Sequence, residues 1–150
     1  MITAKVMTDA VTVTPDTSLA EAARVMLARS VGSVQVVDDA GRLVGMLTES
    51  DLARQTALET DGRHVSWLRA FLSETPFTLD FTAAHSRKVR DVMTENPMSV
   101  EPEDQLPAVA EIMRRLNVKR LPVVDDGTLV GVVSITDLLD ALTTQLAATH

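Results

Sequence analysis

Apolar residues recur at helical spacing in two stretches of the chain. Each stretch places them at positions i, i+3, i+4 and i+7, which predicts an amphipathic helix with one face toward a core. The residues concerned are Leu19, Ala22, Ala23 and Met26 in one stretch, and Leu106, Val109, Ala110 and Met113 in the other.

Polar residues around these stretches predict where the helices begin and end. Ser18, with a glutamate three positions later, predicts a capping box at the first helix, and Asp104 predicts the N-cap of the second. Pro107 would then lie in the first turn, where its missing N–H leaves no bond unmade. Gly32 and Asn117 predict the two helix ends.

Short β-rich runs surround both helices. A brief strand is predicted before each helix, and two longer runs after it, leading into a further helix that begins near Thr48 or Ser134. Asp126-Gly127 is a strong two-residue hairpin signal, and Asp39-Ala40-Gly41 is its three-residue counterpart. We therefore expect antiparallel hairpins. The predicted strands are residues 11–14, 34–37 and 43–47, and residues 98–100, 121–124 and 129–133.

The order of predicted elements is the same twice because the sequence is duplicated. Residues 6–54 align with residues 92–140, with one gap in each, and 19 of the 48 aligned pairs are identical. The class is therefore mixed α+β, with two β-α-β-β-α repeats related by a pseudo-twofold axis. We expect repeats at 1–60 and 91–150, a connecting segment at 61–90, and one core shared by both copies, since a repeat of this size is near the lower limit for independent folding.

The composition of the chain argues against several classes of partner and location. The chain of 150 residues has 14 basic and 21 acidic residues and a net charge of −7, which disfavours nucleic-acid binding. The longest apolar run is residues 43–47, too short to cross a membrane, and the start lacks the apolar core of a signal peptide. The absence of cysteine fits a cytoplasmic location.

Residues 55–90 belong to neither repeat and hold every aromatic residue: Trp67, Phe71, Phe77 and Phe81. We expect a partly helical connection whose aromatics pack on the core. The alternative is a lid or a partner-docking surface. The basic run 86–90 is expected to be a solvated linker, with a second possibility that it lends cations to a phosphate.

Both copies carry a hydroxyl–x–hydroxyl–Asp sequence where the last strand meets the last helix. The residues are Thr48, Ser50 and Asp51 in the first copy, and Ser134, Thr136 and Asp137 in the second. Hydroxyls and free N–H groups at a helix start bind phosphate, and a carboxylate accepts from ribose hydroxyls. Simple helix capping explains a single copy equally well. Its occurrence twice, at aligned positions, favours a binding role.

These repeats closely resemble the CBS (cystathionine β-synthase) domain, and a tandem pair of such domains is called a Bateman module. The resemblance rests on the repeated VMT, the LPVVDD–G–LVGVV strand pair and the hydroxyl–x–hydroxyl–Asp motif. It implies clefts that bind an adenosyl compound such as AMP, ADP, ATP or S-adenosylmethionine as a regulatory ligand, with no required cofactor. It also implies that Asp137 and Asp51 hold ribose and that the neighbouring hydroxyls hold phosphate.

Position by position, the resemblance is unequal between the copies. The second copy has Lys119 and Arg120 before its second strand, suited to phosphate, whereas the first copy has Gly32 and Ser33. We expect a strong site in the second copy and a weaker one at Thr48, Ser50 and Asp51. The adenine would rest on aliphatic residues: Val100, Leu121, Pro122 and Val132.

Three classes of function remain. The leading hypothesis is a nucleotide-responsive regulatory module that acts on an unidentified partner protein. The family resemblance implies that it is a homodimer. The second is a structural dimerisation module with empty clefts. An enzyme is disfavoured because no nucleophile is paired with a base, and no metal site is expected because His64, His85 and His150 lack metal-ligand spacing.

Overall fold

The computed structural model describes residues 1–58 and 87–148; the aromatic segment 64–81 and all three histidines lie outside these ranges. The chain forms two compact units. The first-repeat unit comprises Val11–Asp39 and Val44–Asn96, and the second-repeat unit comprises Met1–Ala10, Ala40–Leu43 and Pro97–His150. The second-repeat unit therefore includes the N-terminal residues Met1–Ala10, and the first-repeat unit extends to Asn96.

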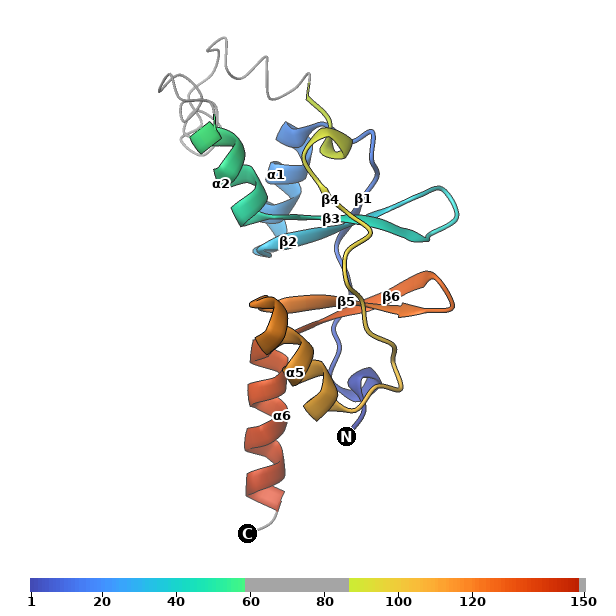
Figure 1. Ribbon diagram of the computed structural model, residues 1–150, viewed down its shortest axis with the longest axis vertical. Helices are drawn as coiled ribbons and strands as arrows, with labels where there is room; N and C mark the ends of the chain where they lie inside the picture. Colours follow the sequence, from blue (N-terminus) through green and yellow to red (C-terminus); the bar gives the residue numbers. More distant parts are fainter. Residues whose placement is uncertain (59–86, 149–150) are drawn as a thin grey trace. The chain divides into compact units, whose positions relative to one another are not determined.

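The first-repeat unit is a small sheet with helices on one side, as Figure 1 shows. Its strands lie in the order β1-β2-β3-β4; β1 runs parallel to β2, and β4 antiparallel to β3. The elements are β1 (Thr12–Val13), α1 (Leu19–Arg29), β2 (Ser33–Val37), β3 (Leu43–Thr48), α2 (Glu49–Leu58), the 3-10 turn η2 (Val89–Asp91) and β4 (Thr94–Glu95).

The second-repeat unit repeats this plan, and with it the mixed α+β class is confirmed. Its hairpin pairs antiparallel, from Arg120 opposite Ser134 to Asp125 opposite Thr128. Single bridges from Val100 and Thr8 extend it on either side. The elements are the 3-10 turn η1 (Thr3–Lys5), α5 (Leu106–Leu116), β5 (Arg120–Asp125), β6 (Thr128–Ser134) and α6 (Ile135–Ala148). None of the helices in the described part of the chain is long and apolar enough to cross a membrane.

Local signals predicted most of the helix and turn boundaries. Ser18 caps α1, accepting from the Glu21 N–H at 3.1 Å, and Pro107 lies in the first turn of α5. The hairpin turn is confirmed at Asp126-Gly127, where both residues have positive φ, 51° and 83°. Asn117 ends α5 in the left-handed conformation, as predicted.

Two predicted helix boundaries are wrong. Gln105, not Asp104, is the N-cap of α5, because the Asp104 carboxylate accepts instead from the Glu101 N–H at 2.8 Å in the preceding turn. Ser30, not Gly32, ends α1: it adopts the left-handed conformation with φ of 54°, which needs no glycine when the residue is small and polar.

The expectation of one shared core is also wrong for the described residues, which form two separate apolar clusters. One gathers Leu19, Val34, Val36 and Leu47 with the buried face of α1, and the other gathers Val109, Met113, Leu121, Val123 and Val133. Met26 and Met113 are buried, as their positions on the helix stripes predict. Each repeat is therefore large enough to bury its own cluster when completed by the segment described next.

Each repeat is completed by the leading segment of the other. We call residues 1–9 the first arm and residues 87–95, which align with them, the second arm. The second arm bonds to the loop before α1, with Val89 N–H donating to Thr17 and Leu19 N–H to Arg87. The first arm makes the aligned bonds to the loop before α5. The distances are 2.8 and 2.9 Å for the second arm (Val89–Thr17, Leu19–Arg87), and 2.9 and 3.1 Å for the first (Thr3–Asp104, Leu106–Met1).

The exchange extends into the sheets. Thr94 of the second arm lies opposite Met46 in β3, and Thr8 of the first arm lies opposite Val132 in β6. Met46 and Val132 are aligned positions of the two repeats. The repeated VMT sequence is therefore an edge strand that pairs with the hairpin of the opposite copy.

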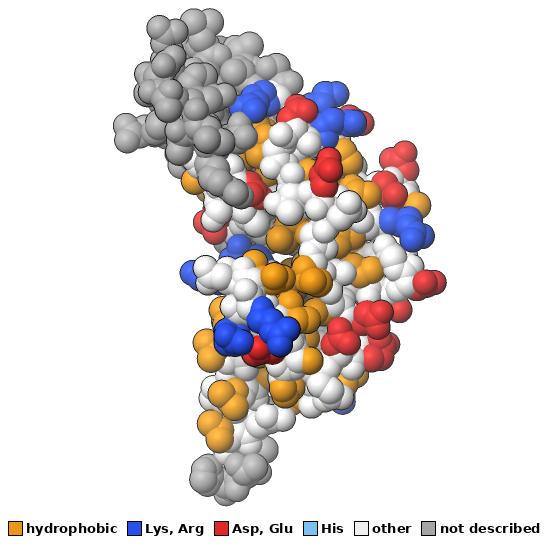
Figure 2. All heavy atoms as spheres, viewed as in Figure 1, with side chains coloured by type: hydrophobic (Ala, Val, Ile, Leu, Met, Phe, Trp, Pro, Cys, Tyr) orange, Lys and Arg blue, Asp and Glu red, His pale blue; other side chains and the backbone are white. Residues whose placement is uncertain are grey.

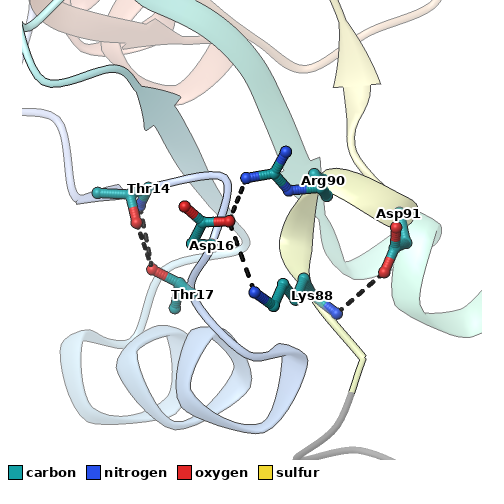
Figure 3. Close-up of polar contacts among 6 residues, drawn as sticks. All are labelled: Thr14, Asp16, Thr17, Lys88, Arg90 and Asp91. Atoms are coloured by element: carbon teal, nitrogen blue, oxygen red, sulfur yellow. Dashed lines mark hydrogen bonds and ion pairs between the residues drawn. The ribbon is translucent and has the colours of Figure 1, made fainter.

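The basic run before the second repeat is docked rather than a solvated linker. Figure 3 shows Asp16, in the loop before α1, facing Lys88 and Arg90 of the second arm. Lys88 Nζ lies 3.6 Å from the Asp16 carboxylate, and Arg90 donates to the same oxygen. The side chains of Lys88 and Arg90 thus reinforce the backbone bonds that attach the second arm.

Candidate functional site

The hydroxyl–x–hydroxyl–Asp motif forms a capping box in both repeats. Thr48 Oγ1 accepts from the Asp51 N–H at 3.1 Å, while the Asp51 carboxylate accepts from the Thr48 N–H at 2.9 Å. Ser134 and Asp137 make the same reciprocal pair at 3.2 and 2.8 Å. The first and last residues of each motif therefore have the structural role of capping α2 and α6.

The capping bonds do not use every backbone N–H group at the start of α2 and α6. The first helical N–H, of Glu49 or Ile135, donates to the carbonyl of Gly32 or Lys119 at 3.0 or 2.8 Å. The next N–H belongs to the middle residue of the motif, Ser50 or Thr136, and no described residue accepts from it.

The middle residue also brings a hydroxyl to the same helix start. Ser50 and Thr136 are both exposed. The hydroxyls of Thr48 and Ser134, which accept from the backbone, keep their protons for donation. Each helix start therefore offers one N–H and two hydroxyl donors to an anion.

Register places four of the predicted residues on one face of the second-repeat hairpin. Arg120 lies opposite Ser134, and Pro122 lies opposite Val132, so that all four side chains share the face away from the core. The Asp137 carboxylate, at the start of α6, accepts a hydrogen bond from the Ser134 N–H and so lies next to this end of the hairpin. A cation, a hydroxyl and a carboxylate are thereby brought together.

Two predicted base-contacting residues lie elsewhere. Leu121 alternates with Arg120 and Pro122 along β5, so it faces the core, where it is 2% exposed. Val100 is also in that core and 2% exposed. The structure therefore groups Pro122 and Val132 with Arg120, but not Leu121 or Val100.

The two repeats differ in charge around the motif. Lys119 is exposed and Arg120 is half-buried, whereas the aligned residues of the first repeat are Gly32 and Ser33. The first turn of α2 adds Glu49 where α6 has Ile135. The motif of the second repeat is consequently surrounded by more positive charge than that of the first, and the stronger site expected there stays a prediction.

A cavity of about 390 Å³ lies between the first arm and α6, within the range of small-molecule sites. Asp137 lines it, together with Lys5 and Val6 of the arm and Asp140, Ala141 and Thr144 of α6. Sequence reasoning missed Lys5 and Val6 because they precede the motif by some 130 residues. The repeated VMT was the available signal. The described residues contain no cluster of three side chains suited to a metal ion.

Comparison with known proteins identifies a family. The model of the CBS domain matches residues 4–57 and 89–144. A protein of Methanocaldococcus jannaschii, MJ1426, is 30% identical over 95% of this chain and 91% of its own length. The structure of CBSX2 in complex with AMP is 27% identical, with a TM-score of 0.73 over 95% of this chain and 96% of that one. The CBS domain pair of MJ0100, solved with 5′-methylthioadenosine and S-adenosyl-L-methionine, is 22% identical with a TM-score of 0.73 over 97% and 98%, and shares the fold.

Proposed function

Since this chain belongs to the CBS domain family and carries two copies of the domain, we propose that it is a regulatory module that binds an adenosyl nucleotide. The ligand belongs to the class of AMP, ADP, ATP or S-adenosylmethionine. The chain itself catalyses no reaction and acts through a partner protein. Reciprocity then requires the partner to change nucleotide affinity by the same factor as the nucleotide changes partner affinity.

The observation that carries the proposal is the donor set of the second repeat. The Thr136 N–H and hydroxyl at the start of α6 are exposed and unused by capping. Arg120 lies in register with Ser134 beside them. A phosphate held there would receive a backbone N–H, hydroxyls and a charge-assisted bond from Arg120, with Lys119 adding a point charge.

Asp137 provides the complementary acceptor for ribose. Its Oδ2 accepts from Ser134, and its Oδ1 takes no hydrogen bond from the described residues. Asp51 holds the same position in the first repeat but is buried, with a relative exposure of 5%. The half-buried side chain of Val132 offers an apolar contact to the base, and Pro122, opposite it in the hairpin, is buried. The CBSX2 complex supports AMP as the first ligand to test.

A thermal-shift panel of AMP, ADP, ATP and S-adenosylmethionine tests the proposal. A ligand at 100 times its Kd stabilises by about 2.7 kcal/mol, which is several degrees for a chain of this size. Arg120→Ala should weaken AMP binding by about 10- to 100-fold through loss of a charge-assisted bond. The control is Arg29→Ala, an exposed arginine at the end of α1. If the panel leaves the melting temperature unchanged, the proposal fails.

Self-association is a second candidate function, supported by the surface of α6. Ile135, Leu139, Leu142 and Leu146 follow a 4-3-4 spacing and are all between 42% and 57% exposed. Figure 2 shows exposed hydrophobic side chains along this helix. This spacing is that of a helix-pairing seam, and the four residues of the stripe are all uncharged. We propose a homodimer through this stripe.

Sedimentation velocity of Leu139→Glu tests the dimer, since a buried seam does not accept a charge. Thr143→Glu, on the same helix but outside the stripe, is the matched control. A dimer that survives Leu139→Glu excludes this interface. A dimer whose melting temperature responds to none of the four nucleotides favours a purely structural module.

A further inference from the structure

Gln35, in the first repeat, has a buried oxygen that the fold does not satisfy. Along β2 the side chains alternate, so Val34 and Val36 pack in the core while Ser33 and Gln35 face the other side of the sheet. Gln35 is 1% exposed. Its Nε2 donates to Ser33 Oγ at 3.4 Å, but its Oε1 is buried with no hydrogen-bond partner within the described residues.

An unpartnered buried carbonyl is unfavourable, because it has lost water without gaining a donor. The aligned residue of the second repeat is Pro122, which carries no side-chain polar group. An apolar residue therefore suffices for packing at this position, so packing does not explain the glutamine in the first repeat. The oxygen of Gln35 accepts only, so a group that completes it must bring an N–H or an O–H.

The charges of the first repeat are less favourable to a phosphate than those of the second. Where the second repeat has Lys119 and Arg120, the first has Gly32 and Ser33. The start of α2, which follows β3 directly, carries Glu49 and Asp51. A phosphate bound in the first repeat would therefore lack the two cations of the second repeat, and Glu49 replaces the uncharged Ile135 at the aligned helix start.

We propose that the first repeat binds an uncharged nucleoside, with Gln35 Oε1 accepting a hydrogen bond from it, and that Gln35 and Ser33 set this selectivity. The inference rests on the proposed adenosyl-binding function and refines it. Adenosine and AMP differ only by the phosphate. The first repeat should therefore prefer adenosine and the second AMP.

Calorimetric titration of adenosine and AMP tests this selectivity. Gln35→Met keeps the length of the side chain and removes the acceptor. It should weaken adenosine binding about tenfold, the worth of one hydrogen bond in a buried site, and leave AMP affinity within about twofold. Its melting temperature without ligand should change little, because removal of the unsatisfied oxygen offsets the loss of the long hydrogen bond to Ser33. Arg120→Ala should show the opposite pattern, losing AMP and keeping adenosine.

A variant that gains affinity complements this test, because a gain of binding cannot result from destabilisation of the fold. Ser33→Arg imports the cation of the second repeat and should raise AMP affinity at the first repeat about tenfold or more, measured in the Arg120→Ala background. Unchanged adenosine affinity in Gln35→Met, or no gain of AMP binding in Ser33→Arg, overturns the inference. Both results leave the proposed function standing if AMP still binds the natural protein. Failure of every adenosyl compound to bind the natural protein overturns the proposed function itself.

Discussion

Within each hydroxyl–x–hydroxyl–Asp motif, neighbouring residues have separable roles. Ser134 and Asp137 cap α6 through reciprocal hydrogen bonds, whereas Thr136 between them takes no part in the cap and is exposed. The Ser134 hydroxyl therefore contributes to the cap, whereas the Thr136 hydroxyl contributes only to the proposed ligand binding. The sequence left open whether the motif caps a helix or binds a ligand. In the structure Ser134 and Asp137 cap the helix, and we propose a binding role for Thr136.

Single-hydroxyl variants test this division. Ser134→Ala should lower the free energy of unfolding by about 1 kcal/mol, the usual effect of losing an N-cap side chain. Thr136→Ala should leave that free energy unchanged within about 0.5 kcal/mol, as for other exposed substitutions, and should weaken AMP binding about tenfold. Urea unfolding and calorimetry measure the two quantities. Equal loss of stability in both variants would contradict the division.

Charged candidate residues are easier to recognise in the sequence than neutral ones. Lys119 and Arg120 are recognisable because a cation before a strand has an evident partner in phosphate. Gln35 gives no such signal, because a glutamine in a strand is ordinarily solvated, and its burial depends on the folded sheet. Leu121 was expected to contact the base but faces the core, because the pattern of its neighbours does not show which face of β5 is buried.

At the scale of elements, two aligned glycines allow the arms to approach the hairpins. A Cβ built on Gly131 would lie 2.8 Å from the backbone oxygen of Thr8, and one built on Gly45 would lie 3.1 Å from that of Thr94. Real Cβ atoms do not approach backbone oxygen at 2.8 Å, so the arm would have to move. The glycine in each LVG sequence is therefore explained by the exchange of arms.

Gly131→Ala should destabilise the protein by about 1–3 kcal/mol, as overpacking against a fixed neighbour does. Gly45→Ala is the comparison and should be milder, because its closest neighbour is the flexible end of the Met93 side chain and the backbone oxygen is farther away. Chemical denaturation of both variants gives the order. A larger loss in Gly45→Ala would show that the arms are not held as described.

The attachment of the second arm should depend on pH. Hydrogen bonding and charge from Arg90 hold the pKa of Asp16 below its usual range, with a smaller contribution from Lys88. Because the folded-state pKa is the lower one, the pair stabilises the fold above the ordinary aspartate pKa of 3.8, and that contribution is lost as the pH falls through the depressed value.

Asp16→Asn should therefore lower the melting temperature slightly at pH 7 and not at pH 2, with the difference reduced by 1 M salt. Melting curves at the two pH values measure it. Glu103→Gln is the matched control, since Glu103 aligns with Asp16 but its aligned partners, Ile2 and Ala4, are uncharged. An equal effect of both substitutions at pH 7 would contradict a specific ion pair.

At the scale of the whole molecule, the duplication and the fold class were predictable, but the exchange of arms was not. Hydrophobic periodicity and turn chemistry act within a few residues, and they predicted the elements of both repeats. The pairing of Thr8 with Val132 joins positions 124 apart. An edge strand of one or two residues has too short a pattern to show which hairpin it joins.

Deletion of residues 1–8 should destabilise the second repeat rather than the first. It removes the backbone bonds to Asp104, Pro102 and Val132 and leaves those of the second arm intact. Hydrogen exchange should show amide protection falling in β6 while β2, in the same sample, is unchanged. A loss confined to β2 would refute the assignment of the arms.

The exchange of arms also bears on what a single repeat can do alone. One copy carries its own arm but offers the docking site for the other, so two separate copies would make the same contacts only as a domain-swapped dimer. Joining the copies in one chain turns that association into an intramolecular step with an effective concentration set by the connecting segment. Duplication thus frees the fold from dependence on protein concentration, and it lets the two repeats carry different residues at aligned positions, such as Arg120 in one and Ser33 in the other.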